Sequence, residues 1–204
     1  VDELKVAEHT LVSWTSDNGA PRRTAMQGSN APLGGWGYST REGGMRVPCI
    51  VRWPGKIPAA AECSELATMM DWLPTLAGLA GAKLPPHPID GHNILPLLQA
   101  EPSAKSPYQA FYYYQNEDLQ AVRSGPWKLH FTSDENNHWQ PTQLYNVVDD
   151  PGEEQNLLPG NADLVKQLLE HATQAAQQLG HQRQPGTEVR PVGKVPSPQP
   201  QRIK

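Results

Sequence analysis

A short apolar strand that ends in three turn-forming residues is the feature that most constrains this chain. The segment Thr10 to Ser16 is apolar and rich in β-branched residues, which is typical of a buried strand. It runs directly into Asp17-Asn18-Gly19, where Asn and Gly permit positive φ and a sharp exit from a sheet. In open α/β sheets, ligands bind at the carboxyl ends of strands, because the loops diverge there. We therefore expect an α/β fold with Asp17 and Asn18 at a ligand-binding edge.

Asp17 and Asn18 are candidate metal ligands. Carboxylate and amide oxygens are hard donors, and they suit Ca²⁺, or Mg²⁺, better than zinc. The same residues also fit an ordinary turn without a metal, because Asn-Gly after a β-branched run is a common turn signal. From these residues alone, both interpretations stay open.

A second segment is longer and more particular. Glu42-Gly43-Gly44-Met45-Arg46 is followed by a strand candidate, Cys49–Trp53, and then by Pro54-Gly55. Together with the upstream Asp17-Asn18-Gly19 and a Gly-rich stretch, in this order and at this spacing, it resembles the arylsulfatase family. The resemblance covers about residues 10 to 180. It continues through Asp71-Trp72-Leu73-Pro74-Thr75-Leu76, Ile89-Asp90-Gly91-His92, Trp127-Lys128-Leu129, Leu144-Tyr145-Asn146 and Asp149-Asp150-Pro151-Gly152-Glu153.

The resemblance implies a fold, a reaction and a cofactor set. The fold would be the C-terminal part of an alkaline-phosphatase-like mixed sheet, followed by a small α+β subdomain. The reaction would be sulfate ester hydrolysis, with Ca²⁺ held in part by Asp17 and Asn18 and with formylglycine as nucleophile. The substrate would be a sulfated small molecule or glycan. The location implied is periplasmic, secreted or lysosomal.

The nucleophile implied by the resemblance is missing from this chain. Formylglycine is made in the family from the Cys of a Cys-x-Pro-x-Arg motif, and neither Cys49 nor Cys63 begins one. We therefore assign no catalytic residue within these 204 residues and expect the chain to be a C-terminal portion that is inactive alone. The two cysteines can form one bridge or remain two thiols, and both possibilities stay open.

Three arginines are candidates for binding an anionic substrate. Arg22 and Arg23 lie in an aperiodic loop, residues 20–36, and Arg41 precedes the Glu-Gly-Gly motif. A guanidinium fork matches sulfate or carboxylate oxygens, whereas solvated loop charges are the alternative. Many sulfatases carry a sulfate-contacting lysine five residues before the glutamate of this motif, and that position here is Gly37. Either Arg41 or a loop arginine supplies the charge instead, or this subgroup does not need it, and both alternatives stay open.

Glu42 and Arg46 are four residues apart and flanked by glycines. This spacing favours an ion pair that braces the loop over a catalytic role for either residue.

Composition excludes two partner classes. A net charge of −4 gives no basic footprint for nucleic acid. No apolar run approaches the roughly 20 residues that a membrane-spanning helix needs. The 21 prolines and 17 glycines predict short elements joined by many turns.

Two units and a tail are predicted along the chain. Residues 1–105 would form the end of the catalytic α/β domain, including a helix with Asp71 as N-cap, Pro74 in its first turn and Gly81 at its end. Residues 106–181 would form an α+β subdomain of about four antiparallel strands and one helix that is capped by Asn161 and ended by Gly180. The predicted strands are 110–114, 119–123, 127–131 and 143–147. We expect the acidic turn 149–154 to be solvated and residues 182–204 to be a disordered or extended tail.

Two other functions remain alternatives to a sulfatase. One is a related phosphoester or phosphonate hydrolase on the same scaffold. The other is a non-catalytic chain that keeps the fold and binds sulfated glycans.

Overall fold

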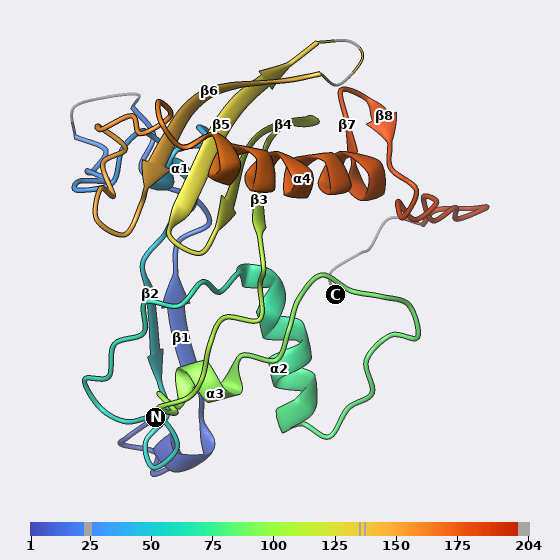
Figure 1. Cartoon of the computed structure of the whole chain (residues 1–204). Coiled ribbons are helices and arrows are strands. Elements are labelled where there is room, and N and C mark those ends of the chain that lie inside the picture. Colours follow the sequence, from blue (N-terminus) through green and yellow to red (C-terminus); the bar gives the residue numbers. More distant parts are fainter. Residues whose placement is uncertain (23–25, 135, 137, 200–204) are drawn as a thin grey trace.

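The computed structural model describes residues 1–22, 26–134, 136 and 138–199, and Figure 1 shows that they form two lobes. The lower lobe holds a 3₁₀ turn, η1 (Ala7–His9), with β1 (Val12–Thr15), β2 (Cys49–Arg52), η2 (Met69–Asp71), α2 (Trp72–Leu79) and α3 (Leu95–Leu98). The upper lobe holds a four-stranded sheet and the long helix α4 (Ala162–Leu179). The loop after β1 runs up beside the upper lobe, where it forms the one-turn helix α1 (Glu42–Met45).

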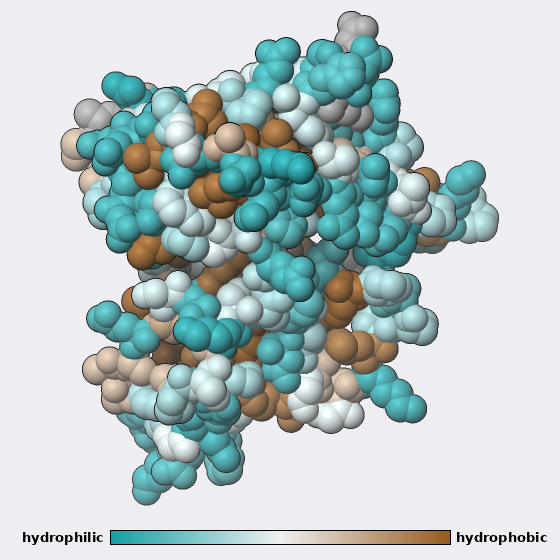
Figure 2. Space-filling model, viewed as in Figure 1, coloured by the Kyte–Doolittle hydropathy of each residue, from teal (hydrophilic) through white to brown (hydrophobic). Residues whose placement is uncertain are grey.

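The lower lobe contains a two-stranded antiparallel sheet. β1 pairs with β2 in a register that places Thr15 opposite Cys49. The strand predicted from Thr10 to Ser16 forms over Val12–Thr15, but the expectation that it is buried is wrong, since Trp14 is 58% exposed. The physical reason is that β1 has one partner strand, and no described helix covers its faces. Figure 2 shows apolar side chains at the surface of this lobe, below the narrowing where the lobes meet.

The helix α2 begins and ends close to where the sequence predicts. Pro74 stands in its first turn, where a missing N–H has no intrahelical partner, and Gly81 follows its end with φ +65°. Asp71 occupies the N-cap position, but its side chain does not cap α2. It closes a capping box with Thr68 and also accepts the backbone N–H of His92. Asp71 therefore ties distant segments together.

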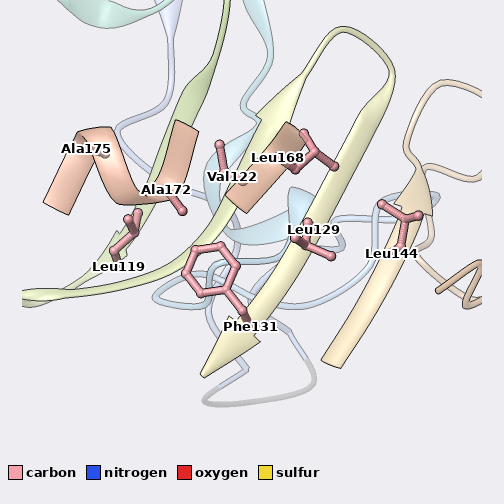
Figure 3. Close-up of a cluster of buried hydrophobic side chains, with 8 residues drawn as sticks. All are labelled: Leu119, Val122, Leu129, Phe131, Leu144, Leu168, Ala172 and Ala175. Atoms are coloured by element: carbon pink, nitrogen blue, oxygen red, sulfur yellow. The ribbon is translucent and has the colours of Figure 1, made fainter. Parts of the chain in front are cut away.

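The upper lobe confirms the predicted strands and helix. Four strands pair antiparallel in chain order: β3 (Phe111–Gln115), β4 (Asp118–Ser124), β5 (Trp127–Ser133) and β6 (Trp139–Asn146). The helix α4 begins after Asn161, whose side chain forms no capping hydrogen bond although the sequence predicts it as the cap. The helix ends at Gly180 with φ +98° and lies across one face of the sheet (Figure 1). Figure 3 shows the core between them: Leu119, Val122, Leu129, Phe131, Leu144, Leu168, Ala172 and Ala175. No helix among the described residues is long and apolar enough to cross a membrane.

Residues 182–188, the first part of the tail expected to be disordered or extended, form contacts with the end of α4. β7 (Gly180–His181) and β8 (Gln184–Pro185) form a short antiparallel pair. The backbone N–H groups of Thr187 and Glu188 then donate to carbonyls near the end of α4. The positive φ at Gly180 reverses the chain and brings residues 182–188 back to the helix end. Residues 200–204 lie outside the described part of the chain.

Candidate functional site

Asp17 and Asn18 lie directly after β1, at the position expected for a ligand-binding edge. The Asn18 side-chain amide donates to the Gly19 carbonyl at 2.8 Å, which fixes the orientation of its oxygen. The Asn18 backbone N–H donates to Asp17 Oδ1 at 2.9 Å. Asp17 Oδ2 and Asn18 Oδ1 accept no hydrogen bond from any described residue. This Asp17–Asn18 edge therefore offers two oxygens, both of them hard donors.

Close backbone packing fixes this edge against the glycine-rich segment. The Gly19 N–H donates to the Gly44 carbonyl at 3.1 Å, and the Gly37 N–H donates to the Ala20 carbonyl at 3.0 Å. A Cβ on Gly19 would lie 1.7 Å from the Gly43 carbonyl oxygen, so no side chain fits there. At Gly37 a Cβ would lie 2.2 Å from the Gly19 carbonyl oxygen. The glycines are required here because two backbone segments touch.

Asn30 is a supporting residue that the sequence did not single out. Its Oδ1 accepts the Ala20 backbone N–H at 2.6 Å, and its amide donates to the carbonyls of Ala20 and Gly35 at 3.0 and 3.2 Å. One side chain thereby joins both ends of the loop 20–36. The residue composition of an aperiodic loop does not reveal which of its asparagines plays this part.

Glu42 contacts the upper lobe, and its predicted ion pair with Arg46 is wrong. Its Oε1 accepts from Lys128 at 3.0 Å and from the Tyr113 hydroxyl at 2.8 Å, while Oε2 pairs with Arg123 at 3.3 Å. Arg46 forms no ion pair within the described chain. The Arg46 backbone N–H still donates to the Glu42 carbonyl at 2.7 Å, but the Glu42 carboxylate lies against the sheet, where Lys128 and Arg123 are its charged partners. Glu42 does brace the loop, but its partners come from the sheet.

Lys128 is the second supporting residue that sequence analysis missed. It is 0% exposed and lies between two carboxylates, with Nζ 3.0 Å from Glu42 and 3.2 Å from Glu153. Its ammonium also stands 3.9 Å from the Tyr113 ring centroid. Burial lowers the pKa of Lys128, and the two carboxylates act in the opposite direction. Alternation along β5 explains the placement, because Leu129 faces the α4 core while its neighbour Lys128 points to the other face.

Glu153 links the acidic turn to the loop, so the expectation that this turn is solvated is wrong at Glu153. The residue is 2% exposed, and its Oε2 accepts the Glu42 backbone N–H at 2.7 Å. Its Oε1 accepts from His130 Nε2 at 2.7 Å. Burial favours a higher pKa for Glu153, but the His130 hydrogen bond and the Lys128 charge outweigh it, and the pKa is lowered. The carboxylate therefore satisfies a free N–H at the start of α1.

The three candidate arginines occupy different surroundings. Arg41 points into the contact with the upper lobe, where it reaches the Tyr145 hydroxyl at 3.3 Å and the Glu153 carbonyl at 3.4 Å. Arg22 is exposed, and its guanidinium carbon stands 5.0 Å from the Trp36 ring centroid. Arg23 lies outside the described residues. The structure therefore gives Arg41 structural partners and leaves Arg22 at the surface.

The residues present fit one part of a metal site. Ca²⁺ takes about six to eight oxygens, and the Asp17–Asn18 edge supplies two. Within the described residues, no group of three or more His, Cys, Asp or Glu is placed to hold a metal ion. Cys49 and Cys63 are free thiols, and burial raises the pKa of Cys49, which disfavours its thiolate. The chain therefore presents neither a complete ligand set nor an activated cysteine within its described part.

Comparison with known proteins shows the family of the chain. The sequence model of the family described as N-sulphoglucosamine sulphohydrolase, C-terminal, matches residues 38–178, which is more than half of the chain. The chain belongs to the sulfatase family. It is 36% identical to arylsulfatase A of Homo sapiens over 83% of this chain and 38% of that protein. It is 35% identical to steryl-sulfatase of Mus musculus over 86% of this chain and 33% of that protein.

Solved sulfatases share the fold. The PsFucS1 sulfatase from Pseudoalteromonas sp. superposes with a TM-score of 0.69 at 27% identity, over 85% of this chain and 39% of that one. Ps i-CgsB, solved in complex with k-i-k-neocarrahexaose, gives 0.67 at 29% identity, over 85% of this chain and 38% of that one. The fold is thus the α/β, alkaline-phosphatase-like fold of sulfatases. The chain spans between a third and two fifths of the length of these relatives.

Proposed function

We propose that this chain is the C-terminal portion of a sulfate ester hydrolase and supplies one edge of its active site. The observation that carries the proposal is the Asp17–Asn18 edge, which has two oxygens free of described partners at a strand end. Family membership supports the reaction class. The loop that holds the edge is in turn fixed to the upper lobe through Glu42, Lys128 and Glu153.

Each part of the reaction places a demand on the protein. Cleavage at sulfur needs a nucleophile, positive charge near the non-bridging oxygens, and a proton for the leaving alcohol. Asp17 and Asn18 would hold Ca²⁺, with Mg²⁺ as the alternative, and such a cation supplies the positive charge when bound. The Asn18 amide keeps its oxygen in one orientation through its bond to Gly19. The nucleophile, formylglycine by family resemblance, would come from outside these 204 residues.

The substrate class proposed is a sulfated small molecule or glycan. Ps i-CgsB, a structural neighbour, was solved with k-i-k-neocarrahexaose, and the curated relatives include steryl-sulfatases and arylsulfatases. A periplasmic, secreted or lysosomal location follows from the same resemblance. Nucleic acid is not among the proposed partners, since the chain carries a net charge of −4.

A turnover assay tests the reaction. We expect the 204-residue chain alone to leave an aryl sulfate intact, and the longest protein that its gene encodes to hydrolyse it. In that protein Asp17→Ala should reduce kcat/KM by on the order of 100-fold or more, because a metal ligand is lost. Asp163→Asn, a change at an exposed residue in the first turn of α4, serves as the control. Turnover by the 204-residue chain alone that is lost on Asp17→Ala would overturn the proposal that part of the active site comes from outside this chain. Hydrolysis of phosphate esters in preference to sulfate esters would overturn the reaction class.

A calcium titration tests the metal edge without turnover. The Asn18 side-chain amide resonances should shift on addition of Ca²⁺ to the longest gene product, and Asp17→Ala should abolish the shift. An unchanged Asn18 signal at saturating Ca²⁺ would remove Asp17 and Asn18 from the ligand set.

A further inference from the structure

Arg22 and Trp36 form a surface pair at the two ends of the loop 20–36. The guanidinium carbon lies 5.0 Å from the indole centroid, within the range of a cation–π contact. Trp36 remains 39% exposed. Such stacking engages the face of a guanidinium, while its five N–H donors lie around the edge. No described residue accepts a hydrogen bond from Arg22 or forms an ion pair with it, so those donors are available to a ligand.

The Arg22–Trp36 pair flanks the Asp17–Asn18 edge. The Gly37 N–H donates to the Ala20 carbonyl, which sets Trp36-Gly37 beside the residues that precede Arg22. Gly37 also packs directly on Gly19, the residue after Asn18. Trp36 is therefore one residue from Gly37, and Arg22 is two residues from Ala20, the two residues whose backbones meet beside the edge.

The geometry excludes two other positions, 37 and 41, from supplying positive charge beside the Asp17–Asn18 edge. A side chain at position 37 would collide with backbone, because its Cβ would lie 2.2 Å from the Gly19 carbonyl oxygen. Arg41, the second arginine near the glycine-rich segment, directs its guanidinium to Tyr145 and Glu153. Compared with these two positions, Arg22 is a described cation whose side chain is exposed beside the edge.

We propose that Arg22, oriented by Trp36, binds the sulfate group of the substrate next to the Asp17–Asn18 edge. This inference rests on the proposed function and adds the residue that recognises the oxyanion. A guanidinium edge can donate two parallel N–H groups to two sulfate oxygens, and stacking limits the rotamers that must be ordered on binding. Trp36 acts through Arg22 and is a positioning residue.

Kinetics of the longest gene product with an aryl sulfate test the assignment. Arg22→Gln should raise KM by on the order of 10- to 100-fold, as expected when a charge-assisted hydrogen bond is lost. Arg22→Lys should recover part of the affinity. Trp36→Leu should raise KM with little change in kcat, and Trp36→Phe should restore the KM of the unaltered protein. Arg183→Gln is the matched control, since Arg183 is also an exposed arginine but lies in the turn between β7 and β8, at the opposite end of the upper lobe. Unchanged KM in Arg22→Gln would overturn the inference and leave the proposed function standing.

A binding experiment on the 204-residue chain separates this inference from turnover. The Arg22 Nε–H and Trp36 Nε1–H signals should shift with 4-methylumbelliferyl sulfate and not with neutral 4-methylumbelliferone, and Arg22→Gln should abolish the Trp36 shift. Suppose that these shifts are observed but the longest gene product hydrolyses no sulfate ester. Arg22 would then be supported as an oxyanion-binding residue, and the proposed function would be overturned. Equal shifts with the uncharged compound would overturn the role of Arg22.

Discussion

The two lobes bury their apolar side chains to very different extents. In the upper lobe the sheet is covered by α4 on one face and by the glycine-rich loop with Glu42 on the other. In the lower lobe, α2 leaves Leu73 56% exposed, and both strands of the small sheet carry exposed apolar residues. The lower lobe buries Ile94 and Leu97, and polar contacts also join its segments. Asp71 joins Thr68 to His92, and the Thr75 hydroxyl accepts the Ile94 backbone N–H at 3.0 Å.

Because of this difference, the lobe with the larger apolar core is not the lobe that carries the Asp17–Asn18 edge. The upper lobe has a closed core and an internal ionic network, so it is the more self-sufficient unit. The Asp17–Asn18 edge belongs to the end of β1 in the lower lobe, yet its loop is fixed by contacts with the upper lobe. The edge therefore takes its rigidity from the lobe that does not carry it. Substitutions that damage one lobe and spare the other test this division.

The largest expected effect comes from removing the buried lysine of the ionic network. Lys128→Met would leave Glu42 and Glu153 as buried carboxylates without their shared partner. Breaking a buried ion pair in this way costs about 3–5 kcal/mol of unfolding free energy. Urea denaturation followed by tryptophan fluorescence measures it, with Lys166→Met on the exposed face of α4 as control. Equal stability of the two variants would show that the network contributes nothing to the upper lobe.

A matched leucine pair compares the lobes directly. Leu168→Ala opens a cavity in the core under α4, and such changes cost about 2–5 kcal/mol. Leu73→Ala, on the exposed side of α2, should cost well under about 1 kcal/mol, because little apolar area leaves contact. Denaturant midpoints of the two variants give the comparison. Similar losses would mean that Leu73 is covered in solution, and the contrast between the lobes would fail.

The contact between the edge and the loop is tested at Gly19. A Cβ there meets the Gly43 carbonyl, so Gly19→Ala must displace backbone, at a cost of about 1–3 kcal/mol for an overpacked site. Gly193→Ala is the control, since nothing lies within 4 Å of its Cβ position. Hydrogen exchange of the Gly19 and Gly37 amides should speed up in the first variant alone. Unchanged exchange in Gly19→Ala would show that the glycine packing does not hold the edge.

The pH response of the upper lobe depends in part on His181. Its Nδ1 accepts the Leu119 backbone N–H at 3.0 Å, which a protonated ring cannot do. Burial lowers the pKa of His181, with Asp118 acting in the opposite direction. The native state thus favours the neutral ring: its contribution is complete above the unfolded pKa of about 6.5 and is lost as pH falls through the lower folded pKa.

Comparison with His181→Asn isolates this contribution. Between pH 7.5 and 5 the unaltered chain should lose more stability than the variant, by about the value of one hydrogen bond, 0.5–1.5 kcal/mol. Other acid-sensitive groups, including His130, whose pKa is also lowered by burial, are common to both proteins. If the stability of the two proteins falls in parallel with pH, His181 does not contribute to the pH dependence.

The sequence predicted what local rules decide. Strand alternation placed β3 to β6, and an apolar stripe between Asn161 and Gly180 placed α4. It failed where distant segments meet. Glu42 has an arginine at helical spacing but pairs with Lys128 from β5, 86 positions along the chain. Glu153 has the composition of a solvated turn but lies buried against α1. From sequence alone, charged residues on the face of a sheet opposite its helix are predicted to face solvent. They are recognised as buried only when the loop that covers that face is known.

The smallest effect we predict concerns two glycines of α2. Gly78 lies inside the helix, and a Cβ there meets only Asn93 Nδ2, at an ordinary 3.6 Å. Gly78→Ala should therefore stabilise the lower lobe by about 0.5–1 kcal/mol through helix propensity and a less flexible unfolded chain. Gly81→Ala has open space as well but requires φ +65°, so it should destabilise. Hydrogen exchange of the α2 amides measures both. If both substitutions slow exchange to the same extent, Gly81 is not held at positive φ in solution. The effect of each alanine would then depend only on the room around its Cβ.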